Sequence, residues 1–443
     1  MSCVDGFYAI VKKDIFLTEK AVKQFFIYFF NDEGASSYIL FSMALGLQAP
    51  WQVKEVTFST DDKLRSELHL HIGFASGSRF PDEANELCPV HDTVDRQWQH
   101  LSFFEHTCYL HCAVPRITTS DGKVRTVEVP WARPGSGFTL LFEALALALI
   151  EREMPVNRVA EILKVNPQRV WTIFNHWISK ARTGDDPSSL TKLGVDETST
   201  KKGHHYVTLG VDLDTSRVIH VTEGKGKATL KSIQQHLEIK GVAKEQVKQI
   251  SMDLSPAFIA GAAESFPEAE ITFDRFHVVK LLNEAMNQVR IVERKEHDAL
   301  KGHKYTFLRN RVNLSDKQEE SLAEMIKLYP TLGEAYRLKV LFNDLWVMPN
   351  KQAAEAFLHQ WCAEVEAAKI PAFMKFAKTV KVHWSGIVHF VTSHITNGIL
   401  EGINCKIQLA KRRARGYRNI NNFINMIYFL CGKLKFDYPL YFT

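Results

Sequence analysis

The sequence predicts an α/β fold for the second half of the chain, preceded by a β-rich module and a group of helices. Short β-rich runs follow one another from Leu193 to Thr222, and further strand-like and helical runs then alternate as far as Leu282. A long, charged, helical stretch comes next. Strands that alternate with helices are typical of an α/β domain.

The composition is that of a multidomain globular protein. With 443 residues the chain exceeds one ordinary domain, and 45% apolar with 24% charged residues excludes wholesale disorder. A net charge of +5 is weak evidence for a nucleic-acid partner. One short segment is more informative, because residues 401–418 carry six cations against one acid.

Cysteine usage and hydropathy indicate a cytoplasmic protein with no membrane partner. Seven cysteines are an odd number without the spacing of a disulfide scaffold, which favours a reducing compartment. The most apolar run, Phe138–Ile150, contains Glu143 and is too short to cross a bilayer.

Residues 1–36 contain no motif and are left as an unassigned N-terminal extension, whereas residues 37–130 have the pattern of a small β-rich module. Val53–Phe58 and Leu68–Ile72 alternate as strands do. We therefore expect a module built mainly from strands.

Cys88 and His91 have the spacing of half a structural zinc site, which needs four ligands. Where a second pair should follow, residues 114–122 offer only Thr, Ser and Asp. Cys108 and Cys112 are possible substitutes, although strand alternation would have to be broken to aim both at one metal. Two interpretations stay open: a degenerate zinc-finger-like module, or cysteines kept as small buried hydrophobic residues.

Residues 135–183 predict an all-α helix-turn-helix. An apolar helix over residues 138–150 and a short one from Pro155 precede Asn166-Pro167, a favourable N-cap and first helical residue. One face of the helix that follows is apolar. The opposite face offers three candidates for contact with base edges in the major groove, Gln168, Arg169 and Thr172. An ordinary three-helix packing unit is the alternative.

Residues 190–288 have the element order of a ribonuclease H-like domain: three strands, then helix, strand, helix, strand and helix. Asp196 lies on the first strand, and Asp253 lies at the end of the fourth. Residues 289–380 read as a long helical insertion that splits this domain before its last helix.

Residues 381–443 supply the last helix of the catalytic core and a basic C-terminal tail. The helix is expected from about Asn397 to Arg413. Ile399, Ile403, Ile407 and Ala410 would form its buried stripe. A separate polar stripe would consist of Asn397, Glu401, Asn404, Gln408 and Arg412.

Asp196, Asp253 and Glu401 are the predicted catalytic and metal-binding acids. Two divalent ions serve phosphodiester cleavage and strand transfer by in-line displacement, and Mg²⁺ or Mn²⁺ prefers oxygen ligands. Rival acids are Glu197, Asp212, Asp214 and Asp274. The expected phosphate contacts are Lys406, Lys411, Arg412, Arg413 and Arg415.

Seven stretches together resemble the ISL-three family of bacterial insertion-sequence transposases, within the DDE superfamily, from about Ser37 to Leu434. They begin at Phe41, Val129, Leu193, Met252, Phe273, Asn397 and Ala410, and read FSMALGLQAPW, VPWARPGSG, LGVDE, MDLSPA, FDRFHV, NGILEGIN and AKRRARGY.

The resemblance implies an N-terminal zinc-binding module, a helix-turn-helix and a ribonuclease H-like catalytic domain, with the acid triad on Asp196, Asp253 and Glu401. It also implies metal-dependent cutting at terminal inverted repeats and joining to a target. Two departures are the missing partners of Cys88 and His91, and residues 1 to about 35, which have no counterpart.

We therefore expect a bacterial, nucleoid-associated DNA transposase that binds double-stranded DNA as a dimer or larger assembly. Two other functions compete with it. A non-catalytic repressor derived from a transposase would need the helix-turn-helix but none of the acids. A ribonuclease H-type nuclease would need the acids but no module that reads DNA ends.

Overall fold

The computed structural model describes residues 35–62, 65–309, 311–393 and 398–437, so almost all of the unassigned extension lies outside the described residues. The chain divides into two compact units, and the boundary between them falls within helix α6 (Pro167–Thr183). The first unit includes the described residues up to Phe174, and the second runs from Asn175 to Phe436. No described helix has the length and apolar character needed to cross a bilayer.

The first unit contains a six-stranded sheet, which confirms the predicted β-rich module. Its strands are β1 (Trp51–Thr60), β2 (Ser66–Phe74), β3 (Arg79–Pro81), β4 (Leu87–Gln99), β5 (Thr107–Thr118) and β6 (Val124–Thr126). Their order is β1-β2-β5-β4-β3, and β6 pairs with β5. Alternate residues of β2, including Leu68 and Leu70, point into a core that also holds Trp51, Trp98 and Trp131. Helix α3 (Ala35–Ala44), which the sequence did not predict, contacts β1.

The geometry of β4 and β5 favours buried cysteines over a zinc site. Cys88 is buried, whereas His91 is exposed and lies at a register shift between Val90 and Asp92. Burial raises the pKa of Cys108 and Cys112 to about 12. Within the described residues, none of these side chains belongs to a group of three or more possible ligands for one metal ion.

Helices α4 (Leu140–Glu151), α5 (Val156–Ile162) and α6 confirm the three predicted helices. Asn166 accepts a hydrogen bond from the Gln168 backbone N–H at 2.8 Å, as expected of an N-cap residue. The turn between α5 and α6 contains Lys164 at φ +54°. Val170, Ile173 and Phe174 of α6 are buried.

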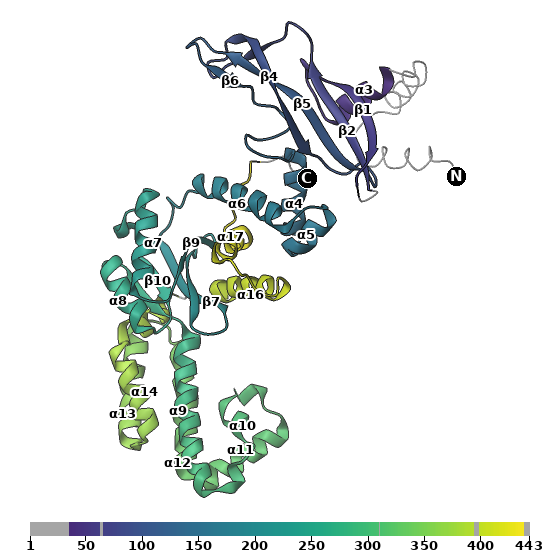
Figure 1. The fold of residues 1–443 in the computed structure, drawn as a ribbon. Coiled ribbons are helices and arrows are strands. Elements are labelled where there is room, and N and C mark those ends of the chain that lie inside the picture. Colours follow the sequence, from purple (N-terminus) through teal and green to yellow (C-terminus); the bar gives the residue numbers. More distant parts are fainter. Residues whose placement is uncertain (1–34, 63–64, 310, 394–397, 438–443) are drawn as a thin grey trace, which may run out of the picture. The chain divides into compact units, whose positions relative to one another are not determined.

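The second unit is built around a five-stranded sheet (Figure 1). Its strands are β7 (Lys192–Lys201), β8 (His205–Asp212), β9 (Arg217–Glu223), β10 (Gln249–Met252) and β11 (Glu270–Phe273), in the order β11-β10-β7-β8-β9. β7, β8 and β9 are antiparallel, whereas β10 runs parallel to both β7 and β11. The predicted meander and the two later strands are confirmed.

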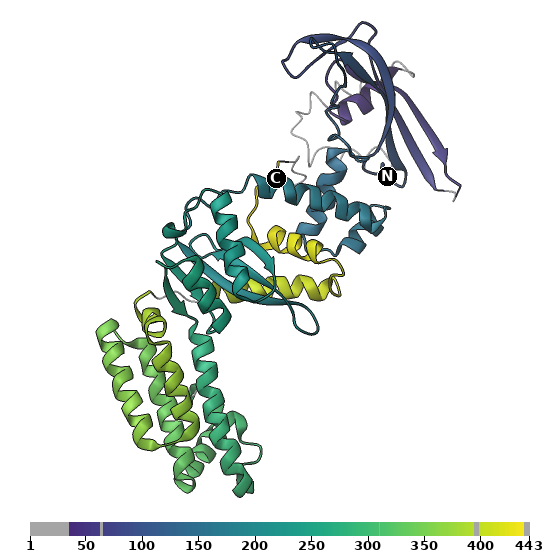
Figure 2. The same ribbon diagram turned by 60° about the vertical axis from the view of Figure 1, so that its left-hand side comes forward.

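Helices lie on both faces of this sheet. An added Cβ at Gly210 would meet Ile233 of α7 (Lys227–Ile239), and one at Gly194 would meet Leu400 of α16 (Gly398–Arg413). Because neighbouring residues of a strand point to opposite faces, Gly194 and Asp196 share the face that α16 covers. α8 (Pro256–Ser265) packs with α7, and α17 (Ile420–Cys431) packs with β9. Figure 2 shows α16 and α17 in yellow beside the strands.

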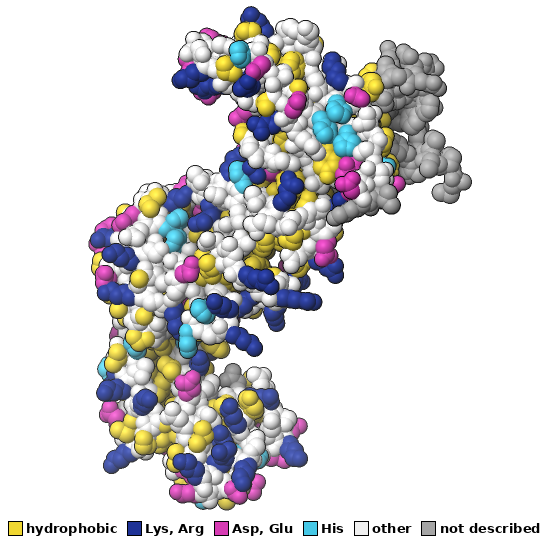
Figure 3. Space-filling view, viewed as in Figure 1, with side chains coloured by type: hydrophobic (Ala, Val, Ile, Leu, Met, Phe, Trp, Pro, Cys, Tyr) yellow, Lys and Arg dark blue, Asp and Glu magenta, His cyan; other side chains and the backbone are white. Residues whose placement is uncertain are grey.

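Helix α16 ends at the predicted residue, and Ile403 and Ile407 of its predicted stripe are buried, but Leu400 replaces Ile399 at the start of the stripe. Leu400, Ile403 and Ile407 are buried, whereas Ile399 and Ala410 are only half-buried. The absence of a side chain at Gly194 leaves room for Leu400. Asn397, expected at the start of the polar stripe, lies outside the described residues. Over α16 the molecular surface carries a group of Lys and Arg side chains (Figure 3).

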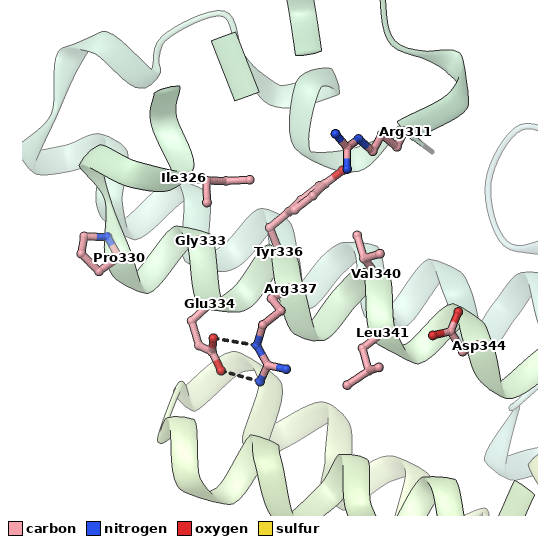
Figure 4. A pocket seen from close by; sticks show the side chains of 10 residues that line it. All are labelled: Arg311, Ile326, Pro330, Gly333, Glu334, Tyr336, Arg337, Val340, Leu341 and Asp344. Atoms are coloured by element: carbon pink, nitrogen blue, oxygen red, sulfur yellow. Dashed lines mark hydrogen bonds and ion pairs between the residues drawn. The ribbon is translucent and has the colours of Figure 1, made fainter. Parts of the chain in front are cut away.

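A long helical segment separates β11 from α16, as the sequence predicted. Its α-helices are α9 (Arg275–Glu296), α10 (Lys304–Leu308), α11 (Asp316–Leu328), α12 (Pro330–Phe342), α13 (Lys351–Ala368), α14 (Pro371–Val382) and α15 (Trp384–Ser393). Phe342, Trp361 and Phe376 pack their rings together at its centre. An open groove of about 610 Å³ lies along α12 (Figure 4), where Arg337 pairs with Glu334. None of the three candidate acids lines this groove.

Candidate active site

Asp196 lies on the central strand of the sheet, with its carboxylate turned toward α16. Its Oδ1 accepts a hydrogen bond from the Glu197 backbone N–H at 2.7 Å. Its Oδ2 accepts a second one from the Asn404 side-chain amide at 2.5 Å. Both carboxylate oxygens are therefore held, one by the strand itself and the other by the last helix of the core.

Asp253 directly follows β10 and lies beside Asp196, because β10 pairs in parallel with β7 through Ser251 and Gly194. Burial is the main cause that raises the pKa of Asp196 to about 7, and the negative charge of Asp253 is the next. Two carboxyl groups that share a poorly hydrated site repel one another unless a proton or a cation intervenes.

Asp274 and His277 complete a polar cluster around Asp253. Asp274 caps α9 by accepting a hydrogen bond from the Phe276 backbone N–H at 3.0 Å. His277 Nδ1 lies 2.7 Å from Asp253 Oδ1 and 3.0 Å from Asp274 Oδ2. Hydrogen bonds to these two carboxylates raise the pKa of His277 to about 10, so the imidazolium is charged at neutral pH.

The sequence pattern did not predict that Asp274 and His277 lie beside Asp253. Asp274 is only a rival acid on sequence grounds, and His277 has no predicted role. A usable signal was present, because Asp274 directly follows a strand that runs parallel to β10 and so ends at the same edge of the sheet. His277 follows one helical turn later.

Glu401 is exposed on the first turn of α16, one turn before Asn404. Residues three apart on a helix share a face, so Glu401 lies on the stripe that reaches Asp196 through Asn404. Within the described residues no hydrogen bond or ion pair joins Glu401 to Asp196 or Asp253, and Glu401 is not among the charges that shift the pKa of Asp196. The structure thus brings two of the three predicted acids together directly.

The side chains around the acid pair fit a hard divalent cation. Asn404 Oδ1 is buried and has no hydrogen-bond donor among the described residues. Asp253 Oδ1 is also buried, and the His277 ring nitrogen lies 2.7 Å from it. Asp253 and Asp274 offer carboxylate oxygens within 4.8 Å of each other. Carboxylate and amide oxygens are ligands that Mg²⁺ and Mn²⁺ favour.

One predicted DNA contact is placed differently by the structure. Lys411 Nζ donates to the Ser199 carbonyl oxygen at 2.7 Å and to the Ser199 hydroxyl at 3.1 Å, and burial lowers the pKa of this ammonium group. Its charge fastens α16 to β7 instead of facing solvent. The other predicted phosphate contacts are exposed: Lys406, Arg412, Arg413 and Arg415.

The base-contact candidates on α6 are all exposed. The Arg169 guanidinium lies over the Phe138 ring, 4.2 Å from its centroid. Thr172 donates to the Gln168 carbonyl oxygen at 3.0 Å within the helix. The side chain of Gln168 therefore has fewer local contacts than the other two candidates.

Comparison with known proteins identifies the family. A family described as transposase matches residues 193–427, more than half of the chain, and the helix-turn-helix domain of transposase family ISL3 matches residues 127–178. The transposase for insertion sequence element IS1557 from Mycobacterium tuberculosis is 27% identical over 353 residues, which cover 73% of this chain and 79% of that protein. The transposase for insertion sequence element IS1001 from Bordetella parapertussis is 28% identical over 341 residues, 74% of this chain and 83% of that protein. The chain therefore belongs to the ISL3 family of transposases.

Proposed function

We propose that this transposase cuts and joins DNA strands at the terminal inverted repeats of an insertion sequence. The reaction is metal-dependent, with Asp196, Asp253 and Glu401 as the ligands of Mg²⁺ or Mn²⁺. The observation that carries the proposal is the pair of half-buried carboxylates on adjacent parallel strands, where burial and then the charge of Asp253 raise the pKa of Asp196.

The sheet supports a ribonuclease H-like catalytic core. Three antiparallel strands come first in the chain, and two strands parallel to the first are then added beside it, in the order β9-β8-β7-β10-β11. This order places Asp196 on the central strand and Asp253 at the end of its neighbour. A helix from the far end of the sequence, α16, then covers the same face.

Each side chain has a definite task in this scheme. Bound Mg²⁺ or Mn²⁺ would activate the attacking oxygen and stabilise the leaving one. Asp196 and Asp253 hold oxygen ligands at the edge of the sheet, and Glu401 adds a third from α16. His277 donates to Asp274 and lies against Asp253, so its positive charge offsets the negative charge of the two carboxylates.

We also propose a division of labour along the chain. Residues 37–130 form the β-rich module, and residues 135–183 read the element ends, with Gln168, Arg169 and Thr172 at base edges. Residues 190–288 and 381–443 form the core that residues 289–380 interrupt, and Lys406, Arg412, Arg413 and Arg415 bind phosphates. Two ends must be held together for transposition, so the working form is a dimer or larger on double-stranded DNA, in the bacterial cytoplasm at the nucleoid.

The variant Asp253→Asn tests the catalytic assignment on DNA that carries the inverted repeats flanking the reading frame. We expect strand cleavage in Mg²⁺ to fall at least roughly a hundredfold, with DNA affinity within about twofold of the parent because α6 is untouched. Asp214→Asn is the matched control, since Asp214 lies in a turn and binds Thr191 and Lys192. Unchanged cleavage by Asp253→Asn would remove Asp253 from the site.

Substrate choice separates this function from its two rivals. A transposase cleaves the repeat-bearing DNA in preference to random duplex, whereas a ribonuclease H-type nuclease prefers an RNA–DNA hybrid. A repressor binds the repeats but cleaves none of the three substrates. Cleavage that shows no preference for the repeats would contradict the proposed reading of element ends.

A further inference from the structure

Three polar contacts fasten α16 to β7. Asn404 donates to Asp196 at 2.5 Å, Gln408 donates to the Thr198 hydroxyl at 2.6 Å, and Lys411 donates to the Ser199 carbonyl oxygen at 2.7 Å. The helical residues are spaced by four and then three positions, so they form one stripe, which continues the line of Glu401. Their partners on β7 are Asp196, Thr198 and Ser199.

Asn404 differs from the other two members of the stripe in what it holds. Gln408 and Lys411 bond to a hydroxyl and a backbone carbonyl, whereas Asn404 bonds to a carboxylate proposed as a metal ligand. Asn404 Oδ1 is buried and has no hydrogen-bond donor among the described residues.

The two hydrogen bonds to Asp196 leave its carboxylate able to bind a cation. An ionised carboxylate has about four acceptor positions on its two oxygens. The Glu197 N–H uses one on Oδ1, and the Asn404 amide uses one on Oδ2. The two N–H donors come from different elements, β7 and α16, and together they fix the rotation of the carboxylate.

We propose that Asn404 is a positioning residue of the metal site, whose amide N–H orients the Asp196 carboxylate for a divalent cation. The inference rests on the proposed function, since it takes Asp196 as a metal ligand. Asn404 also lies one turn from Glu401, so the same hydrogen bond fixes where Glu401 stands along β7. Loss of the amide would weaken metal binding without removing any of the three acids.

The affinity of the full chain for Mn²⁺ in the absence of DNA tests this role. Electron paramagnetic resonance measures it, because the signal reports the concentration of the free ion. Asn404→Ala is expected to raise the dissociation constant for Mn²⁺ about tenfold or more, as the loss of a residue that orients a ligand does. Asp196→Ala should raise it further. Asn404→Leu keeps a side chain of similar size but removes the hydrogen bond, and it is expected to match Asn404→Ala. It takes the place of Asn404→Ala if that variant protein does not fold.

Gln408→Ala is the matched control, because it removes a hydrogen bond of similar length between the same helix and strand. It should leave the Mn²⁺ dissociation constant within about twofold of the parent while lowering the melting temperature as much as Asn404→Ala does. Parent-like binding by both Asn404 variants overturns the inference, and so does an equal loss in Gln408→Ala. If Asp196→Ala binds Mn²⁺ as the parent does, the proposed metal site itself fails.

Discussion

The carboxylates of the candidate site are held by polar side chains from other elements of the core. His277 lies between Asp253 and Asp274, and Asn404 meets Asp196 across 208 positions of sequence. The Asn404 amide supplies an N–H to Asp196, whose pKa burial raises to about 7. The His277 imidazolium supplies positive charge beside Asp253 and Asp274.

The contrast between Lys411 and its neighbour Arg412 gives a prediction for DNA binding. Because Lys411 is bound to Ser199, Lys411→Ala should leave the salt dependence of DNA affinity unchanged and lower the melting temperature. Arg412 is exposed, so Arg412→Ala should reduce the slope of log affinity against log salt by about one.

Fluorescence anisotropy of labelled repeat DNA over a range of NaCl concentrations measures both slopes. Thermal unfolding of the free proteins supplies the stability comparison. A smaller slope for Lys411→Ala would show that its ammonium group reaches a phosphate, contrary to its position against β7.

At the level of elements, the close approach of α16 to β7 depends on a glycine. A Cβ at Gly194 would lie 2.7 Å from Leu213 Cδ2 and 3.0 Å from Leu400 Cδ2, and both leucines are buried. We expect Gly194→Ala to lower the free energy of unfolding by about 1–3 kcal/mol, the usual effect of overpacking. It should also weaken Mn²⁺ binding, because α16 carries Asn404 and Glu401.

Gly402 provides the control on the same helix. A Cβ there meets nothing within 4 Å, so Gly402→Ala should be neutral or raise the free energy of unfolding by about 0.5–1 kcal/mol. Urea unfolding of both variants measures the difference. Equal stability of the two variants would mean that α16 has room to move away from β7.

A half-buried histidine pair between β9 and α7 predicts sensitivity to acid. His220 accepts or donates a hydrogen bond with Ser232 at 3.0 Å and stacks on His236, with ring centroids 4.6 Å apart. Burial, followed by the charges of His236 and Arg182, lowers the pKa of His220 to about 3. The unfolded chain binds this proton near the ordinary pKa of about 6.5, so the contribution of His220 to stability is complete above that pH and is lost as the pH falls toward 3.

At pH 5 the loss should be roughly 2 kcal/mol relative to pH 7. His220→Gln cannot take up the proton and should lose less stability over the same interval. Chemical denaturation of both proteins at pH 7 and pH 5 gives the comparison. An identical pH dependence for parent and variant would contradict the assignment of this acid sensitivity to His220.

For the whole molecule, the proposed reaction requires two element ends in one complex. Repeat-bearing DNA of two lengths, mixed with the protein in Ca²⁺ to limit cleavage, should give three bands in a native gel: two complexes with like ends and one of intermediate mobility. Complexes that hold one DNA each give only two bands. That outcome would contradict the proposed dimer or larger assembly, but it would not contradict the proposed acid site.

Local sequence pattern was sufficient for most elements of the fold. The alternation in Val53–Phe58, the N-cap at Asn166 and the strand runs from Leu193 to Thr222 all depend on neighbours a few residues away, and these elements are confirmed. Asp253 could be placed because it directly follows a strand parallel to β7, whereas Asp196 lies in the middle of β7, which continues to Lys201.

The remaining features of the site depend on how elements pack. The inward position of Lys411, the choice of Leu400 over Ile399 for the core and the position of Asn404 against Asp196 follow from how far α16 is rotated and how closely it approaches β7. A helical pattern defines a buried face only to within about one residue, since successive residues are 100° apart.

Patterns in the sequence were enough to predict the family, the order of strands and helices, and two acids on neighbouring strands. Only the folded chain shows that Asn404 holds Asp196, and that Cys88 has no partners for a zinc site among the described residues. Periodicity and helix capping depend on residues a few positions apart, so they can be recognised in the sequence. The contact between Asn404 and Asp196 joins residues 208 positions apart, and no local pattern predicts it.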